Sequence, residues 1–173
     1  VEHQAMDIDL TLRHFAEVAP RIELQVVRSC AEALERLRQP EPCDAALVDL
    51  RMPDMSGLDF VREATRRGLH LPPFIIISGR GDEQAAIASL QLGAADYVTK
   101  TEGYLDDLRH ALERAIVHDR LDRMNARLQV ELEERTRDQA VSEEHRRFLD
   151  ILLNVMPVAV FSKDAGGRYL VAN

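Results

Sequence analysis

The sequence predicts an α/β protein whose parallel sheet is covered by helices on both faces. Over residues 1–117, short apolar runs of strand length alternate with segments in which apolar residues recur every three or four positions. The runs that end at Asp49 and at Ser78 are almost continuously apolar, which is typical of strands buried on both faces. Such doubly wound sheets place their binding sites at the carboxyl ends of the strands.

The first two strands and helices are predicted near the start of the chain. We expect Val1 to be the last residue of a strand whose earlier part is missing, so that the chain is a fragment. Apolar residues follow helical spacing over 8–18, and residues 22–27 alternate and are rich in β-forming types. Ser29 with Glu32 forms a capping box that begins the second helix.

Three further strands are predicted to end at Asp49, Ser78 and Lys100, which gives a sheet of five parallel strands. A helix is expected after each of these strands. The helix that follows Asp49 is predicted to begin at Ser56, because Asp59 lies three residues later and the two form an approximate capping signal. Strand and helix therefore alternate through the whole region.

The composition excludes several classes of function. The net charge is −8, aromatic residues make up 5% and Trp is absent, which argues against a nucleic-acid binder. No apolar run approaches the length needed to cross a membrane. Cys30 and Cys43 are expected to be reduced thiols of a cytoplasmic protein, because no secretory signal precedes them.

Three side chains of different chemistry follow neighbouring strands of the predicted sheet. Asp49, Ser78 and Lys100 each end one strand. Because parallel strands end at the same edge of the sheet, a carboxylate, a hydroxyl and an ammonium are expected to share one cleft. Phosphoryl transfer needs positioning and charge neutralisation, which these groups supply.

The segment Asp49-Leu-Arg-Met-Pro-Asp-Met-Ser-Gly57 resembles the phosphoacceptor loop of two-component response-regulator receiver domains. The resemblance extends from Val1 to about Val117 and includes Ser78 and Lys100. It implies a flavodoxin-like fold and a role as a phosphoacceptor, with slow self-dephosphorylation as the only chemistry. In that role Asp49 accepts a phosphoryl group from a histidine kinase or phosphotransfer protein and forms an acyl phosphate.

The same resemblance implies a metal ion and a switch. Mg²⁺ or Mn²⁺ would be bound by Asp49, by the backbone carbonyl of Arg51 and by Glu2, which matches one of the family's paired acids. Lys100 would pair with a phosphoryl oxygen and Ser78 would donate its hydroxyl to the phosphoryl group. Tyr97 stands at the family's aromatic switch position and would rotate inward behind Ser78.

Two departures from the family pattern concern the chemistry of the site, and the first of them weakens the metal prediction. The family usually has two adjacent acids where this chain has Glu2-His3, and imidazole is a poorer ligand for Mg²⁺ than a carboxylate. Thr101 replaces the proline that commonly follows the lysine. The alternative function is therefore a degenerate receiver that acts as an unphosphorylated interaction domain. An α/β hydrolase or flavin protein fits less well, because Arg51 occupies the place of the second acid of haloacid-type phosphatases and no glycine-rich phosphate loop is present.

Beyond residue 117 the sequence predicts one long helix, because residues 105–155 contain neither Pro nor Gly. Residues 118–147 are interpreted as a coiled-coil linker that forms a homodimer, and a solvated single helix is the alternative. The stripe thins over 133–147, which suggests a weak or shifted register. The apolar residues of the stripe are Ile116, Leu121, Met124, Leu128 and Leu132.

The last segment, 148–173, resembles the entry of a PAS sensor domain. A helix leads through Met156-Pro157 into a strand over 158–161, followed by a Gly-Gly turn and a strand over 169–172. A generic terminal hairpin is the alternative. Two strands alone are marginally stable in water, so we expect them to belong to a larger domain, with an output module such as a kinase or a cyclic-dinucleotide enzyme beyond it.

Overall fold

The computed structural model describes residues 1–39, 43–79, 82–155, 161–166 and 168–172. The chain divides into two compact units, Val1–Leu121 and Asp122–Asn173, which are described separately. No helix among the described residues combines the length and the apolar character that crossing a membrane requires.

The first unit contains a parallel sheet of three strands among its described residues. The strands are β1 (Ala46–Asp49), β2 (Phe74–Ser78) and β3 (Asp96–Thr99), in the order β1-β2-β3. All residues of β2 are buried, as expected for the most apolar run at the centre of a sheet. Asp49 pairs with Ile77, and Ser78 pairs with Thr99, so the carboxyl ends of the three strands lie at one edge.

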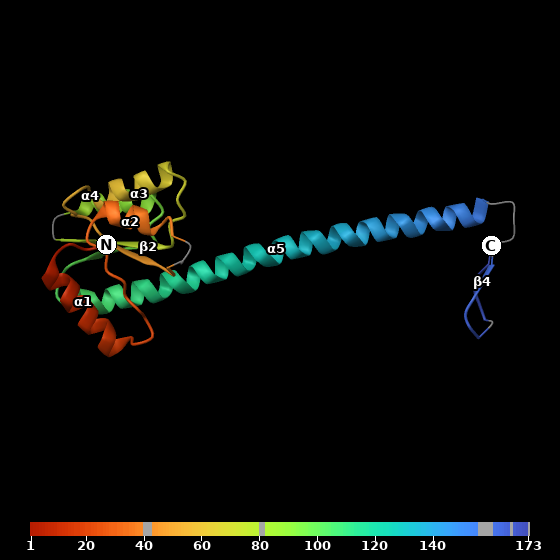
Figure 1. The fold of residues 1–173 in the computed structure, drawn as a ribbon, viewed down its shortest axis with the longest axis horizontal. Coiled ribbons are helices and arrows are strands. Elements are labelled where there is room, and N and C mark those ends of the chain that lie inside the picture. The colour runs from red at the N-terminus through yellow and green to blue at the C-terminus, as the bar shows by residue number, and fades with distance from the viewer. Residues whose placement is uncertain (40–42, 80–81, 156–160, 167, 173) are drawn as a thin grey trace. The chain divides into compact units, whose positions relative to one another are not determined.

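Helices cover both faces of this sheet, which confirms the doubly wound arrangement (Figure 1). One face carries α2 (Cys30–Arg36), α3 (Gly57–Arg66) and α4 (Glu83–Gln91), and the other carries α1 (Ala5–Val18) and the first turns of α5 (Tyr104–Val155). Alternation along β2 explains the two layers. Ile76 packs with Phe60 in one apolar cluster, while Ile75 and Ile77 pack with Leu108 in the other.

The predicted helix starts at Ser29 and Ser56 are confirmed. The Ser29 side chain accepts the N–H of Glu32 at 3.1 Å, which is the first half of a capping box, and the Glu32 carboxylate accepts the N–H of Arg28, one residue before the cap, at 3.0 Å. The Ser56 hydroxyl accepts the N–H of Asp59 at 3.1 Å. Both caps satisfy backbone donors that the first turn of a helix leaves unpaired.

Five strands are not confirmed, because residues 22–27 and Val1 are not in strand conformation. They nevertheless lie where strands would lie. The Asp49 N–H donates to the Val1 carbonyl at 3.0 Å, and the Glu2 N–H donates to the Val27 carbonyl at 3.0 Å. The order 22–27, 1–2, β1, β2, β3 is that of a flavodoxin-like sheet. Two residues between 22–27 and β1 supply too few backbone bonds for a continuous ladder.

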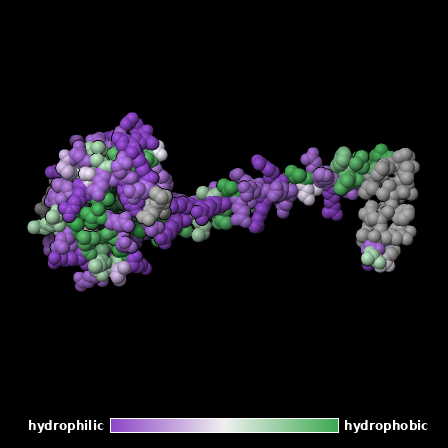
Figure 2. Space-filling model, viewed as in Figure 1, coloured by the Kyte–Doolittle hydropathy of each residue, from purple (hydrophilic) through white to green (hydrophobic). Residues whose placement is uncertain are grey.

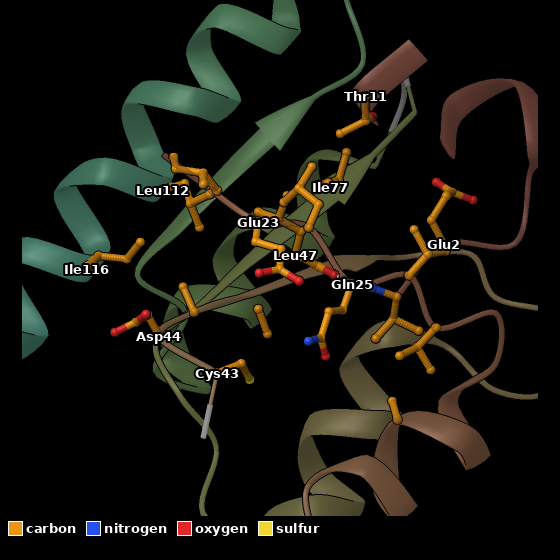
Figure 3. A pocket seen from close by; sticks show the side chains of 18 of the residues that line it. Glu2, Thr11, Glu23, Gln25, Cys43, Asp44, Leu47, Ile77, Leu112 and Ile116 are labelled. Carbon is orange, nitrogen blue, oxygen red and sulfur yellow. Dashed lines mark hydrogen bonds between the residues drawn. The ribbon is translucent and has the colours of Figure 1, made fainter. Parts of the chain in front are cut away.

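A groove of about 730 Å³ lies beside this incomplete edge. Figure 3 shows Leu47 of β1, Leu112 and Ile116 of α5, and the polar side chains of Glu23 and Gln25 around it. The groove is thus bounded by the outer edge of β1, by the segment 22–27 and by α5.

The helix α5 runs from Tyr104 to Val155 without interruption, which confirms the single long helix. Beyond Leu121 its surface is mostly hydrophilic, with apolar side chains at intervals and again toward its end (Figure 2). The exposed apolar residues of this part include Met124, Leu128, Leu132, Val141, Phe148 and Ile151.

Two short antiparallel strands follow, β4 (Phe161–Lys163) and β5 (Tyr169–Ala172). The Asp164 side chain accepts the N–H groups of Gly166 and Arg168, each at 2.9 Å, and so holds the turn. Most of the strand predicted over 158–161 lies outside the described residues. The PAS resemblance therefore stays a prediction.

Candidate functional site

Asp49 lies at the carboxyl end of β1 with only 4% of its surface exposed. Its Oδ1 accepts the backbone N–H of Arg51 at 2.6 Å, because the chain turns sharply after the strand. The bend lies at Leu50, and Met52 and Pro53 follow in the loop between Arg51 and Ser56, where proline cannot continue a ladder and restricts the residue before it to extended geometry. The carboxylate is thereby fixed at the edge of the sheet where the sequence predicts the site.

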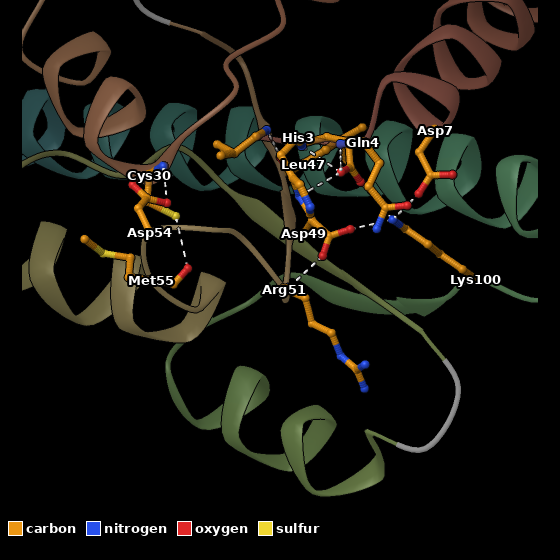
Figure 4. Close-up of polar contacts among 12 residues, drawn as sticks. His3, Gln4, Asp7, Cys30, Leu47, Asp49, Arg51, Asp54, Met55 and Lys100 are labelled. Atoms are coloured by element: carbon orange, nitrogen blue, oxygen red, sulfur yellow. Dashed lines mark hydrogen bonds and ion pairs between the residues drawn. The ribbon is translucent and has the colours of Figure 1, made fainter.

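Lys100 joins Asp49 to two further carboxylates (Figure 4). Its ammonium Nζ hydrogen-bonds to Asp49 Oδ2, lies 2.8 Å from Glu2 Oε2 and lies 2.6 Å from Asp7 Oδ2. An ammonium has three N–H donors, and each carboxylate takes one of them. With all three acids ionised, the group carries two negative charges in excess of the lysine.

The pKa values of this cluster reflect burial in competition with hydrogen bonding. Burial and the neighbouring Glu2 carboxyl raise the pKa of Asp49, against the opposing effects of Lys100 and the Arg51 N–H. Burial also opposes ionisation of Glu2. Hydrogen bonds with the Asp49 carboxyl, the Gln4 N–H and the Lys100 ammonium nevertheless lower the pKa of Glu2 to about 2. Burial disfavours the charge on Lys100, yet its three carboxylate partners raise its pKa.

Glu2 is held by the beginning of α1. Its Oε1 accepts the N–H groups of His3 at 2.7 Å and of Gln4 at 2.8 Å, which leaves Oε2 for Lys100. The His3 ring lies next to the same Oε1, with Nδ1 at 3.4 Å. His3 is therefore beside the oxygen that does not contact Lys100. Among the described side chains, the ligand atoms that lie within 4.8 Å of one another belong to Glu2, Asp7 and Asp49, without His3.

Asp7 is the site residue that sequence reasoning missed. It lies in the first turn of α1, within a stretch that reads as an ordinary amphipathic helix. Helical side chains point back toward the N-terminus of their helix, so an acid in this turn reaches toward the end of the preceding strand. That rule was a usable signal, because α1 starts directly behind Glu2.

Ser78 and Tyr97 form a second part of the site, on β2 and β3. The Ser78 hydroxyl hydrogen-bonds to the Tyr97 hydroxyl and lies 3.0 Å from the Gly79 carbonyl oxygen. The Tyr97 hydroxyl also donates to the Asp82 carbonyl at 3.1 Å. The backbone N–H of Lys100 donates to the Ser78 carbonyl at 2.7 Å, which brings the two predicted residues to adjacent strand ends.

The loop after β1 is tied to two helices. The Asp54 carboxylate accepts the N–H groups of Cys30 at 3.2 Å and of Ala31 at 2.9 Å, at the start of α2. The Arg51 guanidinium donates to Asp82 Oδ1 at 2.8 Å, at the start of α4. These contacts fix the loop that carries the Arg51 carbonyl, the group for which the sequence predicts metal binding.

Substitution of Gly57 by alanine is expected to destabilise the fold by about 1–3 kcal/mol, the usual effect of overpacking. A Cβ at Gly57 would lie 2.5 Å from the Asp49 carbonyl oxygen and 3.0 Å from Val48 Cγ1. The backbone of β1 cannot move aside without displacing Asp49. Chemical denaturation measures the change. Gly79→Ala is the matched control, because a Cβ there would meet nothing within 4 Å, and an equal loss in both variants would contradict the steric explanation.

Acidification is expected to weaken the metal-free fold through Glu2. Because its folded pKa is about 2, below the ordinary 4.5, ionised Glu2 stabilises the fold above pH 4.5. This contribution is lost as the pH falls from 4.5 toward about 2. Thermal unfolding of the chain and of Glu2→Gln across this range measures it. The difference in midpoint should shrink with falling pH, and a constant difference would contradict the assignment.

The family described as response regulator receiver domain matches residues 6–113. The transcriptional regulatory protein KdpE of Mycobacterium tuberculosis is 34% identical over 114 residues, which cover 64% of this chain and 46% of that protein. The DNA-binding transcriptional regulator NtrC of Escherichia coli is 40% identical over 88 residues, which cover 51% of this chain and 18% of that protein. The chain thus spans less than half the length of these relatives.

Solved structures agree with the fold. A response regulator receiver domain protein from Clostridium thermocellum is 28% identical, with a TM-score of 0.55, over 67% of this chain and 87% of that one. The phosphorylated cyanobacterial phytochrome response regulator RcpA is 27% identical, with a TM-score of 0.54, over 65% of this chain and 84% of that one.

Proposed function

The chain belongs to the response regulator receiver domain family, and on this premise we propose that it is a phosphorylation-controlled signalling protein whose phosphoacceptor is Asp49. The observation that carries the proposal is the burial of Asp49 at a strand end, in hydrogen-bond contact with Lys100. The donor is a phosphohistidine on a histidine kinase or phosphotransfer protein, as in two-component signalling.

The transfer uses the two oxygens of Asp49 differently. Oδ1 is engaged by the Arg51 N–H, so Oδ2, which now contacts Lys100, is the oxygen that attacks phosphorus. The new O–P bond forms as the N–P bond to the imidazole breaks, and the departing nitrogen takes up a proton. Lys100 then exchanges its carboxylate partner for a phosphoryl oxygen. Ser78, on the adjacent strand, donates its hydroxyl to another.

The residues present fit a divalent metal ion. Carboxylate oxygens are the ligands that Mg²⁺ and Mn²⁺ prefer, and the Lys100 ammonium already marks a position among them where a cation is accommodated. Glu2, Asp49 and the backbone carbonyl of Arg51 are the proposed ligands. A divalent ion held by these residues would supply positive charge against the phosphoryl oxygens and the acids.

The second candidate function is that of an unphosphorylated interaction domain. Its supporting observation is the pair Glu2-His3, in which the imidazole stands where the family has a second acid and lies beside Glu2. A receiver domain that binds the metal ion too weakly cannot be phosphorylated. It would act only by binding partners through its surface.

We further propose that the signal passes through a parallel homodimer of α5 to a PAS or output module. Apolar side chains that remain exposed along the helix support this, because a helix so polar has little else to bury. The residues Leu121, Met124, Leu128 and Leu132 step by three, four and four, and consecutive fours form a stutter that locally unwinds a left-handed supercoil. Such a site offers two near-equal packings, between which a receiver can switch.

Incubation of the chain with acetyl phosphate and Mg²⁺ or Mn²⁺, followed by intact-mass measurement, tests the phosphoacceptor function. One phosphoryl group should be added, and chelation of the metal should prevent the addition. If no phosphoryl group is added with either metal, the interaction-domain function takes precedence.

A further inference from the structure

We propose that Asp7 is a metal ligand of this site and supplies, from the first turn of α1, the second acid that the Glu2-His3 pair lacks. The inference rests on the proposed phosphoacceptor function and deepens it, because it concerns how this chain binds the divalent ion. It goes beyond the family resemblance, which places the second acid at position 3.

The Asp7 carboxylate borders the same position as the carboxylates of Glu2 and Asp49, the two acids proposed above as metal ligands. One oxygen each of Asp7, Glu2 and Asp49 lies within 4.8 Å of the others, close enough for one ion to contact all three. The Lys100 ammonium occupies the space among them, at 2.6 Å from Asp7 and 2.8 Å from Glu2. A cation is thus already bound there by these carboxylates, and Asp7 is one of its partners.

His3 lies elsewhere. Its Nδ1 is buried against Glu2 Oε1, the oxygen that accepts the His3 and Gln4 N–H groups, whereas Lys100 contacts Oε2. An imidazole in that place does not point into the cation position. The loss of an acid at position 3 therefore leaves the coordination short by one carboxylate, and Asp7 restores both the oxygen ligand and the charge.

The position of Asp7 on the helix also suits exchange of partners. Its side chain is 23% exposed and that of Lys100 is 18% exposed, so a hydrated ion can enter from solvent. Mg²⁺ retains several water ligands and needs few carboxylates from the protein. With a divalent ion on these carboxylate oxygens, Lys100 would be free to contact the phosphoryl group that it is proposed to bind.

Calorimetric titration of Mg²⁺ into the chain and into Asp7→Asn tests the proposal. The substitution keeps the shape of the side chain and removes its charge, and it should weaken Mg²⁺ binding about tenfold or more, the order seen when a metal site loses a partner. Asp9→Asn is the matched control, because Asp9 lies on the same helix, is 59% exposed and pairs with Arg13 at 2.9 Å. It should leave the affinity unchanged. Thermal unfolding checks that both variants fold.

A second pair of variants separates a ligand from a residue that only holds Lys100. In a Lys100→Gln background, Asp7→Asn should still weaken Mg²⁺ binding about tenfold, because the ion contacts Asp7 directly. If the effect of Asp7→Asn disappears in that background, Asp7 acts through Lys100 and is not a ligand. Unchanged affinity in Asp7→Asn, or no Mg²⁺ binding by the unmutated chain, also overturns the inference.

These outcomes are distinct from failure of the phosphoacceptor function. Phosphoryl addition to an unmutated chain whose Mg²⁺ affinity is insensitive to Asp7 would retain Asp49 as the acceptor and reject Asp7 as a ligand. A chain that binds Mg²⁺ through Asp7 but takes no phosphoryl group from acetyl phosphate would reject the proposed function and keep the metal site.

Discussion

Asp49→Asn is expected to abolish phosphorylation of the chain completely. An amide has no anionic oxygen to attack phosphorus, and no other described carboxylate ends a strand of the sheet in contact with Lys100. Intact mass after treatment with acetyl phosphate and Mg²⁺ should show the full phosphoryl addition in the unmutated chain and none in the variant. Any modified Asp49→Asn protein would show that the acceptor lies elsewhere.

The variant should remain folded, so the loss can be assigned to chemistry. Asparagine keeps an oxygen for the Arg51 N–H. It also removes a carboxylate whose pKa is raised by burial and by the nearby Glu2, so ionisation at this position is unfavourable in the fold. Unfolding midpoints near that of the unmutated chain are therefore expected. Asp44→Asn serves as the control, because the Asp44 side chain is 68% exposed and forms a surface ion pair with Arg120 at 3.1 Å.

Replacement of Leu121 and Leu128 by aspartate is expected to convert a dimeric chain into a monomer. The two leucines are 53% and 56% exposed and lie on the apolar stripe of α5. In a paired helix they would be buried, and two charges in the seam would face each other across it. Multi-angle light scattering at tens of micromolar measures the change in mass, and circular dichroism follows the folding of the receiver.

A matched pair of substitutions on the polar side of the same turns controls for charge. Ala126→Asp with Gln129→Asp adds the same two negative charges at exposed positions off the stripe, and it should leave the dimer intact. A monomeric unmutated chain at this concentration would contradict the coiled-coil interpretation. The phosphoacceptor function would be unaffected by that outcome.

Local sequence signals accounted for most of the sheet and for part of the site. The apolar runs before Asp49 and Ser78 are strands, and the caps at Ser29 and Ser56 are formed as the spacing of their partners indicates. These features depend on residues near one another in the chain. The alignment of strand ends follows from topology alone, so the sequence predicts that Asp49 and Lys100 share a cleft, and the two side chains are in contact.

The features that were missed depend on contacts between distant segments. Residues 22–27 have the composition of a strand, but β structure requires a partner, and only Val1 and Glu2 lie between them and β1. Asp7 looked like one more acid in a helix, because its role arises from Lys100, far away in the sequence. The family pattern places the second acid at the position of His3, but the His3 ring contacts the oxygen of Glu2 that does not bind Lys100.

The hydroxyls of Ser78 and Tyr97 have fewer protons to donate than there are acceptors around them. Each hydroxyl can donate one hydrogen bond. The Gly79 carbonyl lies 3.0 Å from the Ser78 hydroxyl and the Asp82 carbonyl lies 3.1 Å from the Tyr97 hydroxyl, so both carbonyls compete with the two hydroxyl oxygens as acceptors. Suppose that the Ser78 hydroxyl donates its hydrogen bond to a phosphoryl oxygen. Among the described residues, the Tyr97 hydroxyl is then the group placed to donate a hydrogen bond to the Ser78 oxygen.

Among the described residues, the carbonyl of Asp82 then keeps the N–H of Ala85, at 2.9 Å, as its donor. Asp82 is the residue immediately before α4. A phosphoryl group on Asp49, at the end of β1, would thus remove the hydrogen bond from Tyr97 to the Asp82 carbonyl, at the start of α4. Tyr97→Phe should uncouple the two events, because the ring stays while the shared proton is gone.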